Sequence, residues 1–88
     1  MKVHIIEDKE PTLEHLQKLV GGYIELKELN DDTQLILNEE GYILRLPTNK
    51  KAMSECQKIL NSSIKTSHLR ILPIRGDVVI LKGKGKLT

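Results

Sequence analysis

Aromatic residues, cysteine and long apolar runs are scarce in this sequence of 88 residues. It has no Phe or Trp and two Tyr, so Leu, Ile and Val must build the core, and an aliphatic core this small favours a homo-oligomer. Cys56 is the single cysteine, which excludes an intrachain disulfide and indicates a reducing cytoplasm. No apolar run approaches the roughly 20 residues that span a bilayer, so we expect no membrane association.

Recognisable active-site motifs are missing as well. His4, His15 and His68 lie more than ten residues apart and lack the close spacing of metal ligands. Cys56 falls on the apolar stripe of an expected helix, without the neighbouring base that a catalytic cysteine needs. No Ser lies in a Gly-x-Ser-x-Gly elbow. The sequence therefore predicts a protein that is not an enzyme and that has no metal site and no cofactor.

Charge is distributed unevenly along the chain. Residues 1–46 contain five Lys/Arg and ten Asp/Glu, a net of −5, and residues 47–88 contain nine and two, a net of +7, which together give the +2 of the whole chain. This asymmetry is typical of a basic surface with an anionic partner, or of two charged faces that pair with each other. Charged faces that only keep the domain soluble explain it equally well.

The hydrophobic pattern predicts an α+β fold, with a small mainly antiparallel sheet and two helices packed on it. The expected order is strand, helix, three strands as a meander, helix, then two strands. The helices begin at Thr12 and Asn49, where a side chain can cap the first turn. The strands are expected at residues 2–7, 23–29, 34–38, 42–46, 69–74 and 78–81. Residues 1–81 form a single domain in this prediction, followed by a flexible basic Gly/Lys tail at 82–88.

Basic residues around the start of the second helix are the candidates for ligand binding. A helix N-terminus favours acidic residues in its first turn, yet Lys50 and Lys51 follow Asn49 directly. Such departures from local rules tend to mark functional sites, and unpaired N–H groups at a helix N-terminus suit an anion. The predicted ligand-binding set is Arg45, Asn49, Lys50, Lys51 and Arg75.

Four stretches together resemble a known family. They are LQKLVGGYIE at residues 16–25, NEEG at 38–41, LPTN at 46–49 followed by Ala52, and GDVVI at 76–80. In this order they resemble an uncharacterised family of small proteins, carried mainly by bacteriophages and mobile elements, whose domain has no known function. The resemblance implies a phage setting and the host cytoplasm, and it implies no catalytic residues. Each stretch also has a purely structural explanation, because each falls at a turn or a cap.

Three functions of different classes remain open from the sequence. The first is a non-enzymatic phage-type protein that captures an anionic, nucleotide-like ligand and so modulates host defence or metabolism. The second is an inhibitor or adaptor that binds a host enzyme through an acidic face, formed by Glu25, Glu28, Asp31, Asp32, Glu39 and Glu40. The third is a nucleic-acid-binding accessory protein, which the basic half favours and the scarcity of aromatic residues opposes.

Overall fold

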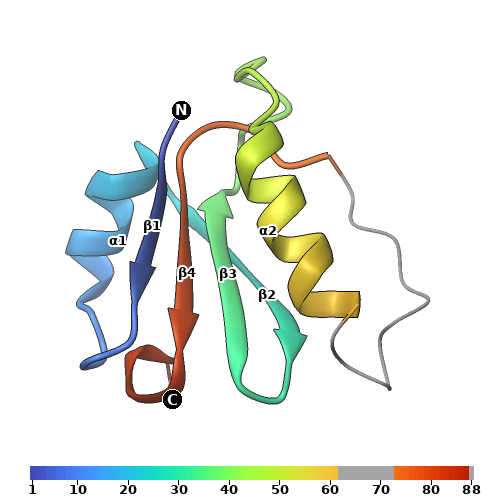
Figure 1. The fold of residues 1–88 in the computed structure, drawn as a ribbon. Coiled ribbons are helices and arrows are strands. Elements are labelled where there is room, and N and C mark those ends of the chain that lie inside the picture. Colours follow the sequence, from blue (N-terminus) through green and yellow to red (C-terminus); the bar gives the residue numbers. More distant parts are fainter. Residues whose placement is uncertain (62–72, 88) are drawn as a thin grey trace.

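A mixed four-stranded sheet lies between the two helices of this computed structural model, which describes residues 1–61 and 73–87 (Figure 1). The strands lie in the order β1-β4-β3-β2. β1 pairs with β4 in parallel, and the other two pairs are antiparallel. This confirms the predicted α+β fold with a small mainly antiparallel sheet and two helices. The elements are β1 (Val3–Ile6), α1 (Leu13–Val20), β2 (Ile24–Asn30), β3 (Thr33–Asn38), α2 (Lys50–Asn61), β4 (Val78–Lys82) and the short 3-10 helix η1 (Gly83–Gly85).

Each face of the sheet has its own apolar core, because successive side chains of a strand point to opposite faces. Leu35 and Leu37 face α2, whereas Ile36 between them faces α1. The core under α2 also contains Cys56, so the prediction that this cysteine is a core residue is confirmed. With both faces covered, β3 is buried at every position and β4 at every position before Lys82, rather than at alternate positions.

α1 begins and ends where its sequence predicts. The Thr12 hydroxyl oxygen accepts a hydrogen bond from the backbone N–H of His15 at 3.2 Å, which caps the first turn. Gly21 ends the helix with a left-handed φ of 81°, and its N–H donates to the Gln17 carbonyl at 2.8 Å. These two residues fix the direction in which the chain enters β2.

The predicted third strand of the meander, residues 42–46, is wrong. Residues 42–45 form consecutive turns, in which the Leu44 N–H donates to the Glu40 carbonyl at 2.8 Å and the Leu46 N–H to the Gly41 carbonyl at 3.0 Å. The physical reason is that β3 already has β2 on one side and β4 on the other. No edge of β3 is left for another strand, and the segment instead becomes part of the β3–α2 loop, residues 39–49.

The C-terminal segment also differs from the flexible tail that the sequence predicts. Lys82 ends β4, η1 follows, and Leu87 packs against the core under α1. The Gln34 amide fixes Leu87 twice: its nitrogen donates to the Leu87 carbonyl at 3.1 Å, and its oxygen accepts from the Leu87 N–H at 2.8 Å. Residues 82–87 are therefore part of the packed domain.

The predicted strand at residues 69–74 falls mostly outside the described residues, and Pro73 and Ile74, which are described, are not in a strand. Within the described ranges, no helix has the length and apolar character needed to cross a bilayer.

Candidate functional site

The β3–α2 loop carries the two most exposed of the large apolar side chains in the described residues, at the end of the sheet drawn at the top of Figure 1. Tyr42 is 81% exposed and Ile43 is 74% exposed, and Leu44 beside them is exposed as well. Consecutive exposed apolar residues are unusual on a small domain, and contiguous ones mark surfaces that bind a partner or a ligand. The β3–α2 loop is therefore a candidate surface for binding a partner or a ligand.

Arg75 connects this loop to the segment that enters β4. Its Nη1 donates to the Leu46 carbonyl at 2.9 Å, and its guanidinium carbon lies 5.5 Å from the centroid of the Tyr42 ring. The backbone of Arg75 also forms an isolated antiparallel bridge with Thr48. These contacts hold the Arg75 guanidinium against an aromatic face, where cation–π attraction stabilises the pair.

A cleft of about 390 Å³ lies where Arg75 and the loop meet. Its lining residues are Tyr42, Ile43, Arg45 and Arg75, and we call it the basic cleft. Two arginines thus line one hollow, and no Asp or Glu is among its lining residues. Of the five predicted ligand-binding residues, the structure brings Arg45 and Arg75 together here.

Arg45 has an unusual backbone conformation for its residue type. Its φ is +54°, and among the described residues every other positive φ belongs to a glycine. A left-handed conformation costs an arginine roughly 1–2 kcal/mol relative to the common regions of the backbone map. Strain of this kind is concentrated at functional sites, so the conformation of Arg45 is a second feature that points to the basic cleft.

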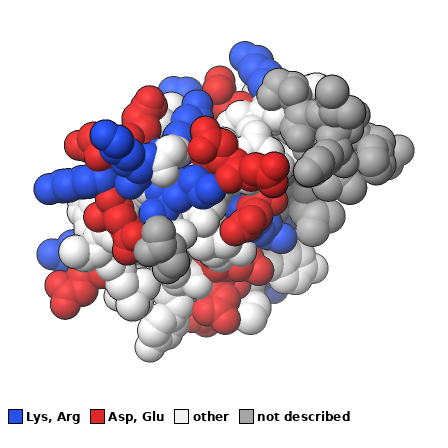
Figure 2. Space-filling view, turned by 90° about the horizontal axis from the view of Figure 1, so that it is seen from below, with Lys and Arg blue, Asp and Glu red and all other residues white. Residues whose placement is uncertain are grey.

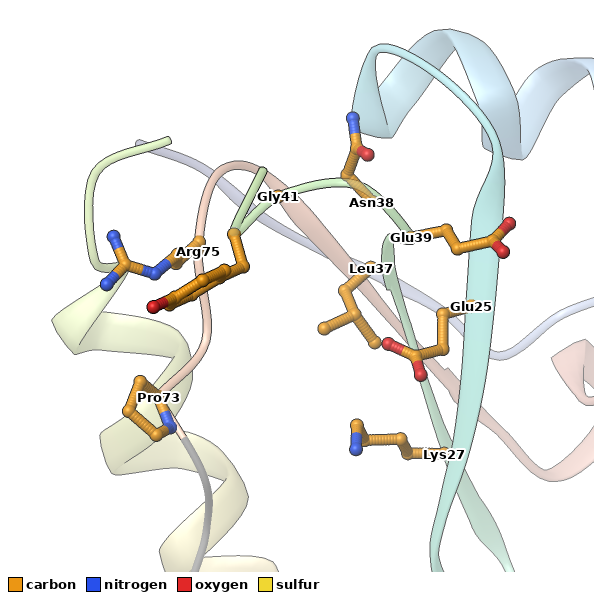
Figure 3. A pocket seen from close by; sticks show the side chains of 9 residues that line it. Glu25, Lys27, Leu37, Asn38, Glu39, Gly41, Pro73 and Arg75 are labelled. Carbon is orange, nitrogen blue, oxygen red and sulfur yellow. The ribbon is translucent and has the colours of Figure 1, made fainter. Parts of the chain in front are cut away.

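A second cleft, of about 330 Å³, lies beside the basic cleft on the α2 side of the sheet. Figure 3 shows Leu37 between Glu25 and Lys27 on β2 and Arg75 and Pro73 opposite them. Tyr42 and Arg75 line both clefts. This second cleft, which we call the sheet cleft, has acidic and basic side chains in its lining and therefore less preference for an anion.

Asn49 has a structural role that uses both ends of its amide. It is 1% exposed, and its side-chain oxygen accepts from the Ala52 N–H at 3.0 Å, which caps α2. Its nitrogen donates to the Gly76 carbonyl at 2.8 Å and to the Lys2 carbonyl at 3.1 Å. Asn49 therefore joins α2 to the starts of β1 and β4, and it does not line the basic cleft.

Lys50 and Lys51 are exposed on the first turn of α2, which has no acidic residue. Neither lysine lines the basic cleft or the sheet cleft. Sequence reasoning misses Tyr42 and Ile43, because the run Tyr42–Leu46 predicts a third strand of the meander. The signal that could have identified them is three large apolar residues followed by Arg45 directly after the turn at Gly41.

The end of the molecule opposite the basic cleft, where residues 82–87 lie, is not purely basic, although the second half of the sequence carries the excess of positive charge. Figure 2 shows this end, where Lys and Arg side chains adjoin Asp and Glu side chains. A hollow there is lined by Glu28 and Asp32 as well as by Lys84 and Lys86. Lys86 also donates from its Nζ to the Asp31 carbonyl. Much of the positive charge of residues 82–87 is therefore next to acidic residues of the β2–β3 turn.

Metal and thiol chemistry find no support in the described ranges. No group of three or more His, Cys, Asp or Glu side chains among residues 1–61 and 73–87 is arranged to hold a metal ion. Burial, with a smaller contribution from the charge of Glu55, raises the pKa of the Cys56 thiol from 9.0 to about 11. A thiol that stays protonated and buried is a poor nucleophile.

Comparison with known proteins gives a family without a function. The family model described as DUF3846, a domain of unknown function, matches residues 1–88. No curated protein and no solved structure matches the chain at a significant level.

Proposed function

Because the chain belongs to the DUF3846 family, a domain of unknown function, we propose its function from the basic cleft: it is a non-enzymatic protein that binds a small anion carrying a planar ring, such as a nucleotide. The observation that supports this most is the meeting of Arg45 and Arg75 in one cleft whose lining has no carboxylate. Arg45 and Arg75 lie 30 positions apart in the sequence and line the same cleft, which supports the proposal.

The chemistry of the lining matches the two parts of such a ligand. Guanidinium groups recognise phosphate oxygens through planar N–H donors, often in pairs. The bond from Arg75 to the Leu46 carbonyl uses one of the five N–H donors of that group. The exposed Tyr42 ring offers a surface on which a base can stack. A volume of about 390 Å³ lies within the usual range of small-molecule sites.

The biological setting of this proposal comes from the resemblance to phage-borne proteins. A phage protein that binds a nucleotide signal tightly lowers its free concentration in the host cytoplasm, and this requires no catalytic group. In this proposal the protein modulates host defence or host metabolism by capture alone. The step from binding to defence is an analogy with other small phage proteins rather than a property of the fold.

The binding step can be tested by following the melting temperature of the protein with a panel of nucleotides, nucleosides and inorganic phosphate. We expect a nucleotide at about ten times its dissociation constant to raise the melting temperature by about 5 °C or more. Phosphate or nucleoside alone is expected to give a smaller shift, because each reaches only part of the cleft. No shift with any compound at millimolar concentration contradicts the proposal.

Two variants locate the binding. Arg45→Gly removes one guanidinium and suits the φ of +54°, so we expect it to fold well and to bind about ten-fold more weakly. Lys50→Gln is the matched control, because it removes one exposed positive charge outside the basic cleft. Equal shifts for wild type, Arg45→Gly and Lys50→Gln would place the ligand elsewhere.

A second candidate function is binding of a host protein through the acidic face. All six acidic residues of the predicted face are exposed in the structure: Glu25, Glu28, Asp31, Asp32, Glu39 and Glu40. Glu39 and Glu40 are separated by Gly41 alone from the exposed apolar run of the β3–α2 loop. A pull-down from host lysate that is lost with Glu39→Lys/Glu40→Lys, and kept with Arg45→Gly, would favour this candidate over the first.

The nucleic-acid alternative is weaker, because acidic side chains adjoin the lysines of residues 82–87.

A further inference from the structure

β2 is an edge strand of the sheet, and none of the described residues 1–61 and 73–87 pairs with its outer side. It lies at the end of the sheet order, with β3 as its neighbour. Among residues 1–61 and 73–87, no backbone hydrogen bond reaches β2 from any segment outside its ladder with β3. β2 is seven residues long, and its register with β3 is regular from Ile24 to Glu28, before a shift between Glu28 and Asn30. This regular part of the edge is a template for pairing with another chain.

The pairing with β3 determines which backbone groups face outward. The Glu39 N–H donates to the Tyr23 carbonyl at 2.9 Å, and Tyr23 is one position before the paired residues Ile24 and Asn38. Backbone groups of an antiparallel strand alternate between its two neighbours. Glu25 and Lys27 therefore bond toward β3, like Tyr23. Ile24, Leu26 and Glu28 present their backbone N–H and C=O groups to the outer side.

We propose that β2 pairs antiparallel with β2 of a second copy of this chain, around a twofold axis at Leu26. Leu26 then lies opposite Leu26 of the second copy, and Ile24 lies opposite Glu28. These are the residues whose backbone groups face outward, so each pair can exchange both hydrogen bonds. The Leu26 side chain, which is 40% exposed in the single chain, becomes covered by its own copy.

Charge and strand length together select this register, because an axis at Glu28 brings two carboxylates together and an axis at Ile24 pairs only the first few residues of β2. Hydrogen bonds across the interface require that a residue whose backbone groups face outward lies opposite another such residue. A twofold axis that passes through a residue meets this requirement. An axis between two residues does not, because it places an outward-facing residue opposite one that bonds to β3. An axis at Glu25 brings two carboxylates together, and an axis at Lys27 brings two ammonium groups together. An axis at Leu26 places Glu25 opposite Lys27 of the second copy, and does so twice by symmetry. Non-hydrogen-bonded pairs have the closest side chains, with Cα atoms about 4.5 Å apart, so these opposite charges meet directly.

This self-complementarity is the reason that the occupant is a second copy rather than another protein. A twofold interface uses the same patch on both chains, and β2 has the opposite charges in the positions that this symmetry requires. β1, the other edge, is shorter, and its four residues Val-His-Ile-Ile contain no acid to form such a pair. The dimer joins two sheets into one and gives the small aliphatic core the support expected from the sequence.

The test is sedimentation equilibrium of the full chain with a charge-reversal series. We expect the wild type to sediment at twice the 10.0 kDa of one chain. Glu25→Lys and Lys27→Glu each place two like charges opposite each other, so each should weaken the dimer at least ten-fold. The double variant Glu25→Lys/Lys27→Glu restores opposite charges and should dimerise like the wild type. An equal mixture of the two single variants should form a heterodimer.

Glu7→Lys and Lys9→Glu are the matched controls, because both residues are exposed and lie outside β2. They make the same charge changes and should leave the dimer intact, as should Arg45→Gly in the basic cleft. Circular dichroism confirms that each variant is folded. The inference is overturned if the wild type is a monomer at high micromolar concentration, if the single variants dimerise as the wild type does, or if the double variant stays as weak as the single ones.

Discussion

The guanidinium carbon of Arg75 lies 5.5 Å from the centre of the Tyr42 ring, so that a residue from the loop before α2 is fixed by a residue that enters β4. The pair forms a wall shared by the basic cleft and the sheet cleft. A contact made by an exposed ring contributes modestly to stability, yet it determines the shape of both clefts. Stability and binding should therefore respond differently to changes at this pair.

Tyr42→Ala is expected to lower the free energy of unfolding by about 0.5–1 kcal/mol, because an exposed cation–π contact is lost. Tyr42→Phe keeps the ring and should be within about 0.3 kcal/mol of the wild type. Urea unfolding measures both. Ile43→Ala, which removes a neighbouring exposed side chain, is the control and should change little. A loss with Ile43→Ala as large as with Tyr42→Ala would refute a specific role for the ring.

Asn49→Ala should be strongly destabilising, by about 3 kcal/mol. The change removes the cap of α2 and leaves the Gly76 and Lys2 carbonyls without their donor. Asn49→Asp keeps the capping oxygen but loses the donors, so it should also destabilise. The control is Asn61→Ala at the exposed last residue of α2, for which we expect less than about 0.5 kcal/mol. If both alanine variants unfold at the same urea concentration, Asn49 does not join the elements as described.

Gly85→Ala tests whether the C-terminal segment is packed. A Cβ at this position would collide with the carbonyl group of Ile6, whose backbone cannot move without disturbing β1. We expect a loss of about 2 kcal/mol in the free energy of unfolding. Lys84→Ala, in the same 3-10 helix but exposed, should have almost no effect. Wild-type stability in Gly85→Ala would mean that residues 82–87 are an unpacked tail after all.

Cys56 should make stability depend on pH in alkaline solution. Burial raises the pKa of its thiol from 9.0 to about 11, so the folded protein holds the thiol proton more tightly than the unfolded chain does. This contribution is complete below pH 9 and is lost as the pH rises from 9 to 11, by up to about 2 kcal/mol. Cys56→Ala lacks it, so the stability difference between wild type and Cys56→Ala should shrink over this range. A difference that stays constant would contradict the raised pKa.

The sequence predicted those elements whose ends are determined by local chemistry. Thr12 and Gly21 bound α1 through a side-chain cap and a left-handed glycine, and both effects involve only neighbouring residues. The buried strand at 78–81 was recognised from its continuous apolar run, which burial on both faces produces. Asn49 was correctly expected to start α2, for the same local reason.

The errors arose where a distant segment decides the outcome. The pattern of residues 42–46 satisfies a strand, but β4, which is remote in the sequence, takes the place beside β3. The Gly/Lys segment at 82–86 has the composition of a flexible tail, but Gln34 and the core under α1 hold Leu87. Arg45 and Arg75, which were selected for their charge, both line the basic cleft, whereas its other lining residues, Tyr42 and Ile43, lie in the segment for which the sequence predicts a strand.

The most direct test of the central claim is an amide chemical-shift titration of the isotopically labelled protein with a nucleotide that raises its melting temperature. Our account predicts that the largest shifts fall on Tyr42, Ile43, Arg45 and Arg75, and that Arg45→Gly reduces them while leaving the rest of the spectrum unchanged. Shifts concentrated at Lys50 and Lys51, or on the lysines of residues 82–87, would contradict a binding site in the basic cleft.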